Sequence, residues 1–131
     1  MMVRSCALAL GAVTAFCLVS SAAMAQGAMA QTAPPTYKGD PDVYKLIFED
    51  ANFRVIEAVR KKGVHDKTHG HPVRAVVYNL TDCKTKVYTP DGKVTERDAK
   101  AGTVAAVPII PAHSAENVDS GDCRQIFVER K

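Results

Sequence analysis

The chain has 131 residues, a length typical of a single domain. Its 17 Lys and Arg residues against 14 Asp and Glu residues give a net charge of +3, which is too small to indicate a nucleic-acid or anionic-membrane partner. With 47% hydrophobic residues, 24% charged residues and no biased tract, a disordered or fibrous protein is excluded as well.

Residues 1–25 are typical of a secretory signal peptide. Arg4 supplies a positive charge, residues 5–19 form an uncharged apolar run, and residues 22–25 end in an Ala-x-Ala cleavage pattern. A similar pattern makes Ala30 an alternative cleavage site. A transmembrane anchor is the other interpretation, but Ala, Gly and Ser dilute the run below the roughly 20 apolar residues that a spanning helix needs. We therefore predict a periplasmic or secreted protein without membrane attachment after cleavage.

Cleavage changes the cysteine inventory. Cys6 and Cys17 leave with the signal peptide, and the mature chain keeps Cys83 and Cys123. Two cysteines in an oxidising compartment favour one disulfide, with two separate buried thiols as the alternative. A bridge between them would close a loop of about 40 residues and contribute roughly 4 kcal/mol in the chain-entropy model.

The mature chain predicts an all-β domain after a short leader. Residues 26–43, rich in Gln, Ala, Pro and Gly, predict a flexible leader. Beyond them, short apolar segments alternate with turn signals, as in a sandwich or barrel. Strands are expected at residues 44–48, 53–59, 73–80, 84–89, 93–98, 103–107, 113–118 and 124–129. Pro-Asp-Gly at 90–92 and Ser-Gly-Asp at 120–122 predict tight turns.

Three of the four histidines form a candidate metal site. His69 and His71 lead into an expected strand, where residues two apart face the same side with Cα atoms about 6.6 Å apart. Two such imidazoles can reach one ion, because metal–nitrogen bonds are about 2.0–2.1 Å long. Gly70 between them suits a close approach of another backbone. His113 follows a proline-rich corner and offers a third ligand, with Asn117 on the same strand face.

These residues resemble the two sequence motifs of the cupin superfamily. Gly63, His69 and His71 match G-x5-H-x-H, and the second motif, G-x5-P-x-G-x2-H-x3-N, is matched by Gly102, Pro108, His113 and Asn117. The resemblance implies a single cupin-type (RmlC-like) jelly-roll β-barrel over residues 44–131. It also implies metal ligation by the three histidines and structural roles for the other four residues. In that topology Cys83 and Cys123 lie at one end of the barrel, within bonding reach.

The chain departs from the first motif at its glutamate, which would fall at Ala75 or Val76. The positions of two further motif glycines are occupied by Asp82 and Ile110. These two departures affect turn geometry. Three neutral imidazoles leave a divalent metal with its full charge, so the site favours an anionic ligand. An octahedral Fe(II) there would keep positions for substrate and dioxygen, as in cupin dioxygenases with three histidines, whereas tetrahedral Zn²⁺ would support hydration or hydrolysis.

No acidic residue replaces the missing glutamate on the expected ligand face. Glu57 shares a strand face with apolar residues that we expect to point inward, but an exposed edge charge is the simpler interpretation. Glu116 is expected to point outward. His65 and Asp66 precede the His-x-His strand and are expected in a solvated loop.

We therefore predict a protein that binds one divalent metal ion (Fe, Mn, Ni, Cu or Zn) through His69, His71 and His113. Its predicted activity is that of a dioxygenase-type oxidoreductase on a small anionic substrate. The apolar residues expected to line the pocket are Val73, Val77 and Phe127. A non-catalytic module for a metal or small ligand and a metal-free structural barrel are the alternatives. Edge-strand pairing, common among cupins, leaves a homodimer open.

Overall fold

The computed structural model describes residues 33–131, so the predicted signal peptide lies outside the described residues. The elements of this part are α1 (Thr36–Gly39), β1 (Tyr44–Glu49), β2 (Phe53–Arg60), β3 (His69–His71), β4 (Ala75–Asn79), β5 (Cys83–Tyr88), β6 (Val94–Ala99), β7 (Val104–Val107), β8 (Ile110–Asn117) and β9 (Cys123–Arg130). The described residues contain no helix with the length and apolar character that crossing a bilayer would take.

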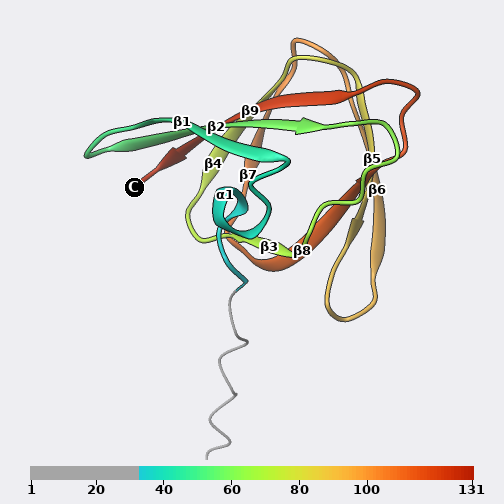
Figure 1. The fold of residues 1–131 in the computed structure, drawn as a ribbon, viewed down its shortest axis with the longest axis horizontal. Coiled ribbons are helices and arrows are strands. Elements are labelled where there is room, and N and C mark those ends of the chain that lie inside the picture. The colour runs from blue at the N-terminus through green and yellow to red at the C-terminus, as the bar shows by residue number, and fades with distance from the viewer. Residues whose placement is uncertain (1–32) are drawn as a thin grey trace, which may run out of the picture.

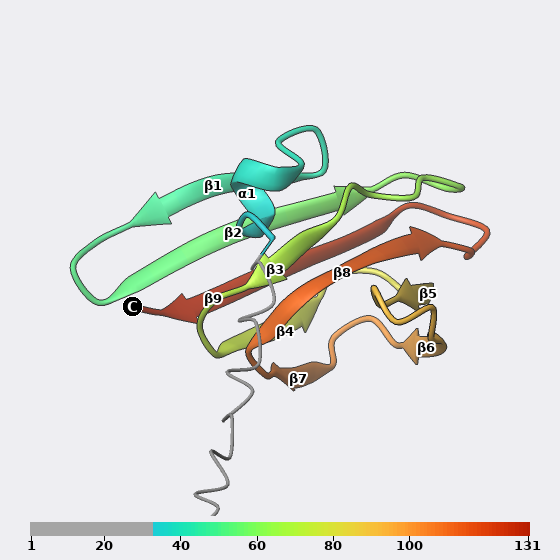
Figure 2. The ribbon, with the colours of Figure 1, turned by 90° about the horizontal axis from the view of Figure 1, so that it is seen from below.

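The strands form two antiparallel sheets that enclose one interior (Figures 1 and 2). One sheet has the order β1-β2-β9-β4-β7 and the other the order β3-β8-β5-β6. The predicted all-β jelly roll is confirmed. Neither sheet closes on itself, so the predicted barrel is a pair of open sheets.

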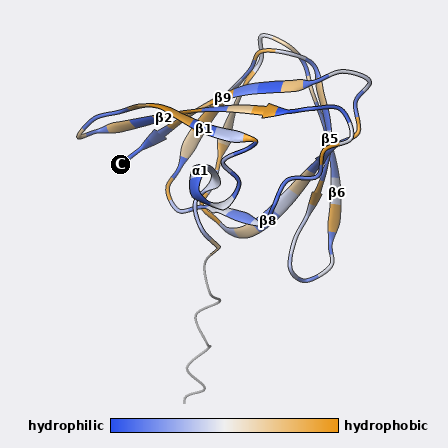
Figure 3. Ribbon diagram, viewed as in Figure 1, coloured by the Kyte–Doolittle hydropathy of each residue, from blue (hydrophilic) through white to orange (hydrophobic). Residues whose placement is uncertain are grey.

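Strand alternation decides which residues face the interior. On β4, Ala75 and Val77 are buried, whereas Val76 and Tyr78 are exposed. Figure 3 shows hydrophobic and hydrophilic residues interleaved along the strands rather than gathered in one element. This interleaving is typical of strands with one buried face and one face toward solvent.

The interior face of β2 is the opposite of the one we expected. Ile56, Ala58 and Arg60 are buried there, whereas Glu57 lies on the outer face. Glu57 is half-buried and paired with Arg124 at 3.0 Å, so it does not point inward; it is not at a sheet edge, however, because β2 lies between β1 and β9. The apolar content of both faces of β2 made the two registers hard to distinguish, because a shift of one residue exchanges the faces.

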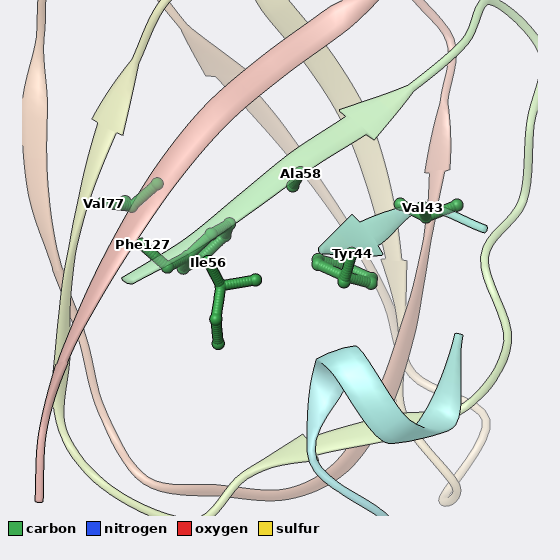
Figure 4. Packing of buried hydrophobic residues seen from close by; sticks show 6 residues of the cluster. All are labelled: Val43, Tyr44, Ile56, Ala58, Val77 and Phe127. Atoms are coloured by element: carbon green, nitrogen blue, oxygen red, sulfur yellow. The ribbon is translucent and has the colours of Figure 1, made fainter. Parts of the chain in front are cut away.

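The hydrophobic core lies between the sheets and is built largely from the five-stranded one. Figure 4 shows its side chains on β1, β2, β4 and β9 and just before β1. The members of this cluster are Val43, Tyr44, Ile56, Ala58, Val77 and Phe127. Phe127 is directly opposite Ile56 on one side and Val77 on the other, so it joins three strands. The core occupies one part of the interior and leaves the part beside β3 and β8 to polar side chains.

The chain changes sheets at two proline-containing corners. Residues 72–74 separate β3 from β4, so the single strand that we expected to run on from the histidines is two strands in different sheets. Pro72 lacks the backbone N–H that a continuous ladder would need. Pro108 lies in the second corner, between β7 and β8. These corners place β3 beside β8.

The domain begins earlier than Tyr44, the boundary that we predicted. Within the expected flexible leader, Thr36, Asp40 and Val43 are buried, and Pro35 forms a β-bridge with Gly70. The main-chain N–H of Gly70 donates to the carbonyl of Pro34 at 2.8 Å. Residues 33–43 are therefore packed against β3, because several of their side chains, polar as well as apolar, are buried in the interior.

Cys83 and Cys123 form a disulfide with a Cα–Cα distance of 5.0 Å. The two cysteines begin β5 and β9, so the bond joins the two sheets. The predicted turns are confirmed as well: residues 90–92 lie between β5 and β6, and residues 120–122 lie between β8 and β9.

Candidate metal centre

Three histidine side chains converge between the two sheets. His69 and His71 come from β3 and His113 from β8, and His69 is directly opposite His113 in the ladder. One ring nitrogen of each lies within 4.8 Å of the others. The ring centroids are 4.5 Å apart for His69–His113, 5.1 Å for His71–His113 and 5.6 Å for His69–His71. The structure thus brings together the three histidines that the sequence singled out.

The tautomer of His69 leaves a lone pair for an ion. Its Nδ1 lies 2.8 Å from the carbonyl oxygen of Lys67, which can only accept, so Nδ1 carries the proton. Nε2 is then an acceptor. The nearby hydroxyl of Tyr44, at 3.4 Å, directs its proton to Asp66 at 2.7 Å instead. A backbone carbonyl that fixes the tautomer in this way is typical of metal-binding histidines.

The other two imidazoles each hold a buried nitrogen that lacks a partner. Among residues 33–131, Nδ1 of His71 and Nε2 of His113 make no hydrogen bond. A buried polar atom without a partner costs about 1–3 kcal/mol. Histidine nitrogens without partners in one cluster fit a metal ion, which would bind an imidazole lone pair of each ring.

Burial keeps these imidazoles in the form that binds metals. Burial, together with the neighbouring His69, lowers the pKa of His71 to about 4. Burial and the other two histidines lower the pKa of His113 to about 3. The pKa of His69 is also lowered by burial, partly offset by Asp66. All three are therefore neutral near pH 7, as ligation requires.

Gly70 allows β3 to lie close to β8. A Cβ added at Gly70 would lie 2.8 Å from the carbonyl oxygen of Pro111 and 3.0 Å from that of Ile110. The close backbone approach that we predicted at Gly70 is confirmed. It sets the spacing between the two strands that carry the histidines.

Replacing Gly70 with Ala is expected to lower the free energy of unfolding by about 1–3 kcal/mol, because the added methyl group pushes against backbone rather than a movable side chain. Urea denaturation followed by circular dichroism measures this loss. Gly121→Ala is the matched control, since a Cβ at Gly121 meets nothing within 4 Å. Equal stability of the two variants would contradict the close approach.

A buried charge network supports the cluster from behind. Asp66 accepts hydrogen bonds from Arg60 at 2.8 and 3.0 Å and from the hydroxyl of Tyr44. Its other oxygen accepts from the main-chain N–H of Ala115 at 2.6 Å. The same carboxylate oxygen lies 3.8 Å from Nδ1 of His69. Asp66 therefore connects β2, the loop before β3 and β8 around His69.

The prediction that Asp66 lies in a solvated loop is wrong. The signal that could have located it is Arg60, which follows Ile56 and Ala58 on one face of β2. A charged side chain on an otherwise apolar strand face needs a buried counter-charge. Gly63, with φ of +75°, turns the chain between Arg60 and Asp66 so that the pair can form. His65 is exposed, as expected, and stacks on Tyr88 outside the cluster.

A small cavity opens beside the histidines. Its volume is about 90 Å³. Its lining residues are Tyr44, Arg60, His71, Val77, Thr85, Val87, Arg97, Val107, Ile110, His113, Ala115, Gln125 and Phe127. Val77 and Phe127 line it as predicted, whereas Val73 does not. The lining includes two arginines and no carboxylate, and its apolar side chains limit the room for water.

The remaining motif residues lie in turns around the site or form hydrogen bonds that hold its segments together. Gly102, like Gly63, has a positive φ, at +78°, which favours glycine. Asn117 is buried and donates from Nδ2 to the carbonyls of Arg60 and Gly121, at 2.9 and 2.8 Å. Ala75 faces the interior, so it holds a methyl group where the motif glutamate would point toward the site. Glu116 lies between the inward residues of β8 and bonds to Tyr88.

Comparison with solved structures identifies the fold. A cupin domain from Bordetella pertussis Tohama I superposes with a TM-score of 0.63 at 18% identity, covering 76% of this chain and 96% of that one. The chain has the cupin fold. An RmlC-like cupin with a double-stranded β-helix fold from Methanocaldococcus jannaschii gives a TM-score of 0.54 at 14% identity, over 67% of this chain and 78% of that one. A polyketide cyclase from Streptomyces resistomycificus gives 0.52 at 17% identity, over 74% and 68%.

The sequence itself matches no protein-family model and no curated protein. At identities below 20%, these structures establish the arrangement of strands and not the chemistry. The function of this domain with the cupin fold therefore has to be argued from its own histidines and cavity.

Proposed function

We propose that this cupin domain binds one divalent metal ion through His69, His71 and His113 and acts as a dioxygenase-type oxidoreductase on a small anionic substrate. The observation that carries the proposal is the convergence of three neutral imidazoles, with ring nitrogens within 4.8 Å of one another, two of which (His71 and His113) line a cavity. Nδ1 of His71 and Nε2 of His113 are also buried and have no partner in residues 33–131.

A bound Fe, Mn, Ni or Cu ion would supply Lewis acidity and redox chemistry at this place. Three neutral ligands leave the ion its full charge, so the centre favours an anionic substrate. In a dioxygenase reaction both atoms of dioxygen enter the substrate, so no external reductant is needed.

The protein's own residues orient the site and limit water. Lys67 and Asp66 hold His69 from its Nδ1 side, so its Nε2 stays available. Val77, Val107 and Phe127 form an apolar wall along the cavity. An apolar wall strengthens electrostatic interactions with an anion and keeps water from competing for the site.

We also propose that the protein acts in the periplasm or outside the cell. The disulfide supports an oxidising compartment. The basic start, apolar run and Ala-x-Ala pattern of residues 1–25 support export.

A non-catalytic metal-binding module is the second candidate. The metal-ligand cluster of the described residues contains no carboxylate, and the cavity lining offers none that could act as a general base. Oxygen consumption with small carboxylates, thiols and diketones separates the two candidates. Metal uptake without oxygen consumption by the iron-loaded protein would favour the module.

The metal site is tested by elemental analysis of the mature protein, purified without a His-tag or chelator. Close to one equivalent of a transition metal is expected for the wild type. His69→Ala and His113→Ala are expected to lose it, because each removes one of three ligands. His65→Ala is the matched control, since His65 is exposed and outside the cluster. Wild-type protein that stays below about a tenth of an equivalent after metal soaking would refute the proposal.

A further inference from the structure

Arg97 lies at the edge of the histidine cavity. It is the central charged residue of β6, and it is directly opposite Thr85 of β5. Residues opposite each other in an antiparallel pair share one face of the sheet. Thr85 is buried and lines the cavity, so Arg97 faces the cavity too, and its side chain is part of the lining. It is nevertheless exposed to solvent, as expected for a residue at an entrance.

Arg97 differs from its neighbours in having no counter-charge. On either side, Glu96 pairs with Lys86 at 3.8 Å and Asp98 pairs with Lys100 at 3.2 Å. No side chain of residues 33–131 forms an ion pair or hydrogen bond with the guanidinium of Arg97. In the sequence Glu-Arg-Asp, only Arg97 faces inward. Its two acidic neighbours face the other side of the sheet and therefore do not neutralise its charge.

The rest of the cavity does not neutralise this charge either. Arg60, the other arginine of the lining, is paired with Asp66 at 2.8 Å. Arg97, His71 and His113 line the same cavity. The cavity thus has a metal-ligand cluster on one side and an unpaired guanidinium on the other.

We infer that Arg97 binds the carboxylate of a small organic acid whose second donor group reaches the histidine cluster. The inference rests on the metal site proposed above and names the class of its substrate. A guanidinium matches a carboxylate with two parallel N–H···O bonds. The apolar wall formed by Val77, Val107 and Phe127 suits a short hydrocarbon chain that extends away from the carboxylate and the second donor group. A 2-oxo acid with a short branched chain has this pattern of groups.

The inference is tested with the mature protein loaded with Co(II), titrated with 3-methyl-2-oxobutanoate by calorimetry and visible absorption. Arg97→Gln is expected to weaken binding at least tenfold, and Arg97→Lys, which keeps the charge but not the planar fork, is expected to retain part of it. Imidazole, a neutral metal ligand, should bind equally to wild type and Arg97→Gln. Arg130→Gln is the matched control, because Arg130 is an exposed arginine on the other sheet.

Each of the other possible results of this titration overturns one defined part of the inference. If cobalt binds but the oxo acid binds wild type and Arg97→Gln equally, or binds neither, Arg97 does not recognise the substrate and the metal site stands. If inorganic phosphate binds more tightly than the oxo acid with the same dependence on Arg97, the carboxylate class is wrong. If cobalt does not bind, the proposed metal site fails, and the titration is repeated on metal-free protein. A tenfold loss in Arg97→Gln would then still support anion binding by Arg97, and no difference would refute it.

Discussion

Replacing Asp66 with Ala is expected to lower the free energy of unfolding by about 3–5 kcal/mol, because the buried guanidinium of Arg60 would lose its counter-charge. Both side chains are almost completely buried, with exposed fractions of 4% for Arg60 and 0% for Asp66. The change also removes the acceptor for the main-chain N–H of Ala115. Urea denaturation of the mature protein, monitored by circular dichroism, measures the loss.

Two further variants separate the buried charge from other effects of the substitution. Arg60→Met combined with Asp66→Ala removes the uncompensated charge and is expected to recover part of the lost stability. Asp42→Ala is the matched surface control, since Asp42 pairs with Lys67 but is 87% exposed, and it should change stability by less than about 0.5 kcal/mol. A loss for Asp66→Ala no larger than for Asp42→Ala would show that the Arg60–Asp66 pair does not hold the interior together.

Replacing both Cys83 and Cys123 with Ala is expected to lower the free energy of unfolding by about 4 kcal/mol, because the disulfide spans 40 residues and restricts the unfolded chain. For a domain of this size, such a loss corresponds to a fall in Tm of roughly 15–30 °C. Differential scanning calorimetry measures it. A strong reductant should produce a comparable fall in the wild type and none in the variant. An unchanged wild-type Tm under reduction would contradict a stabilising bond.

Most of the strands could be predicted because their residues alternate with turn signals along the chain. The segments at 44–48, 84–89, 93–98, 103–107 and 124–129 each lie within one or two residues of an observed strand. The turn at 90–92 has a local cause in its Pro-Asp-Gly sequence. The His-x-His and His-x3-Asn spacings likewise sufficed to select the three histidines that converge.

Other features were missed because their causes are not local. Residues 33–43 have few apolar side chains, and their order comes from contacts with β3 that a composition argument does not include. The separation of β3 from β4 follows from the change of sheet at Pro72, although the alternation of buried residues continues through Ala75 and Val77. Which face of β2 points inward depends on the strand register. Both faces of β2 carry apolar residues, so the sequence allowed either register.

The sequence by itself determined the strand order along the chain, the candidate ligands His69, His71 and His113, and the two cysteines left after residues 1–25. Local spacing and residue chemistry suffice for these. Only the tertiary structure decided that Asp66 is buried against Arg60, that two imidazole nitrogens lack partners, and that Arg97 faces the same cavity as the histidines. These properties arise where segments distant in the chain come together, and sequence separation carries no information about such contacts.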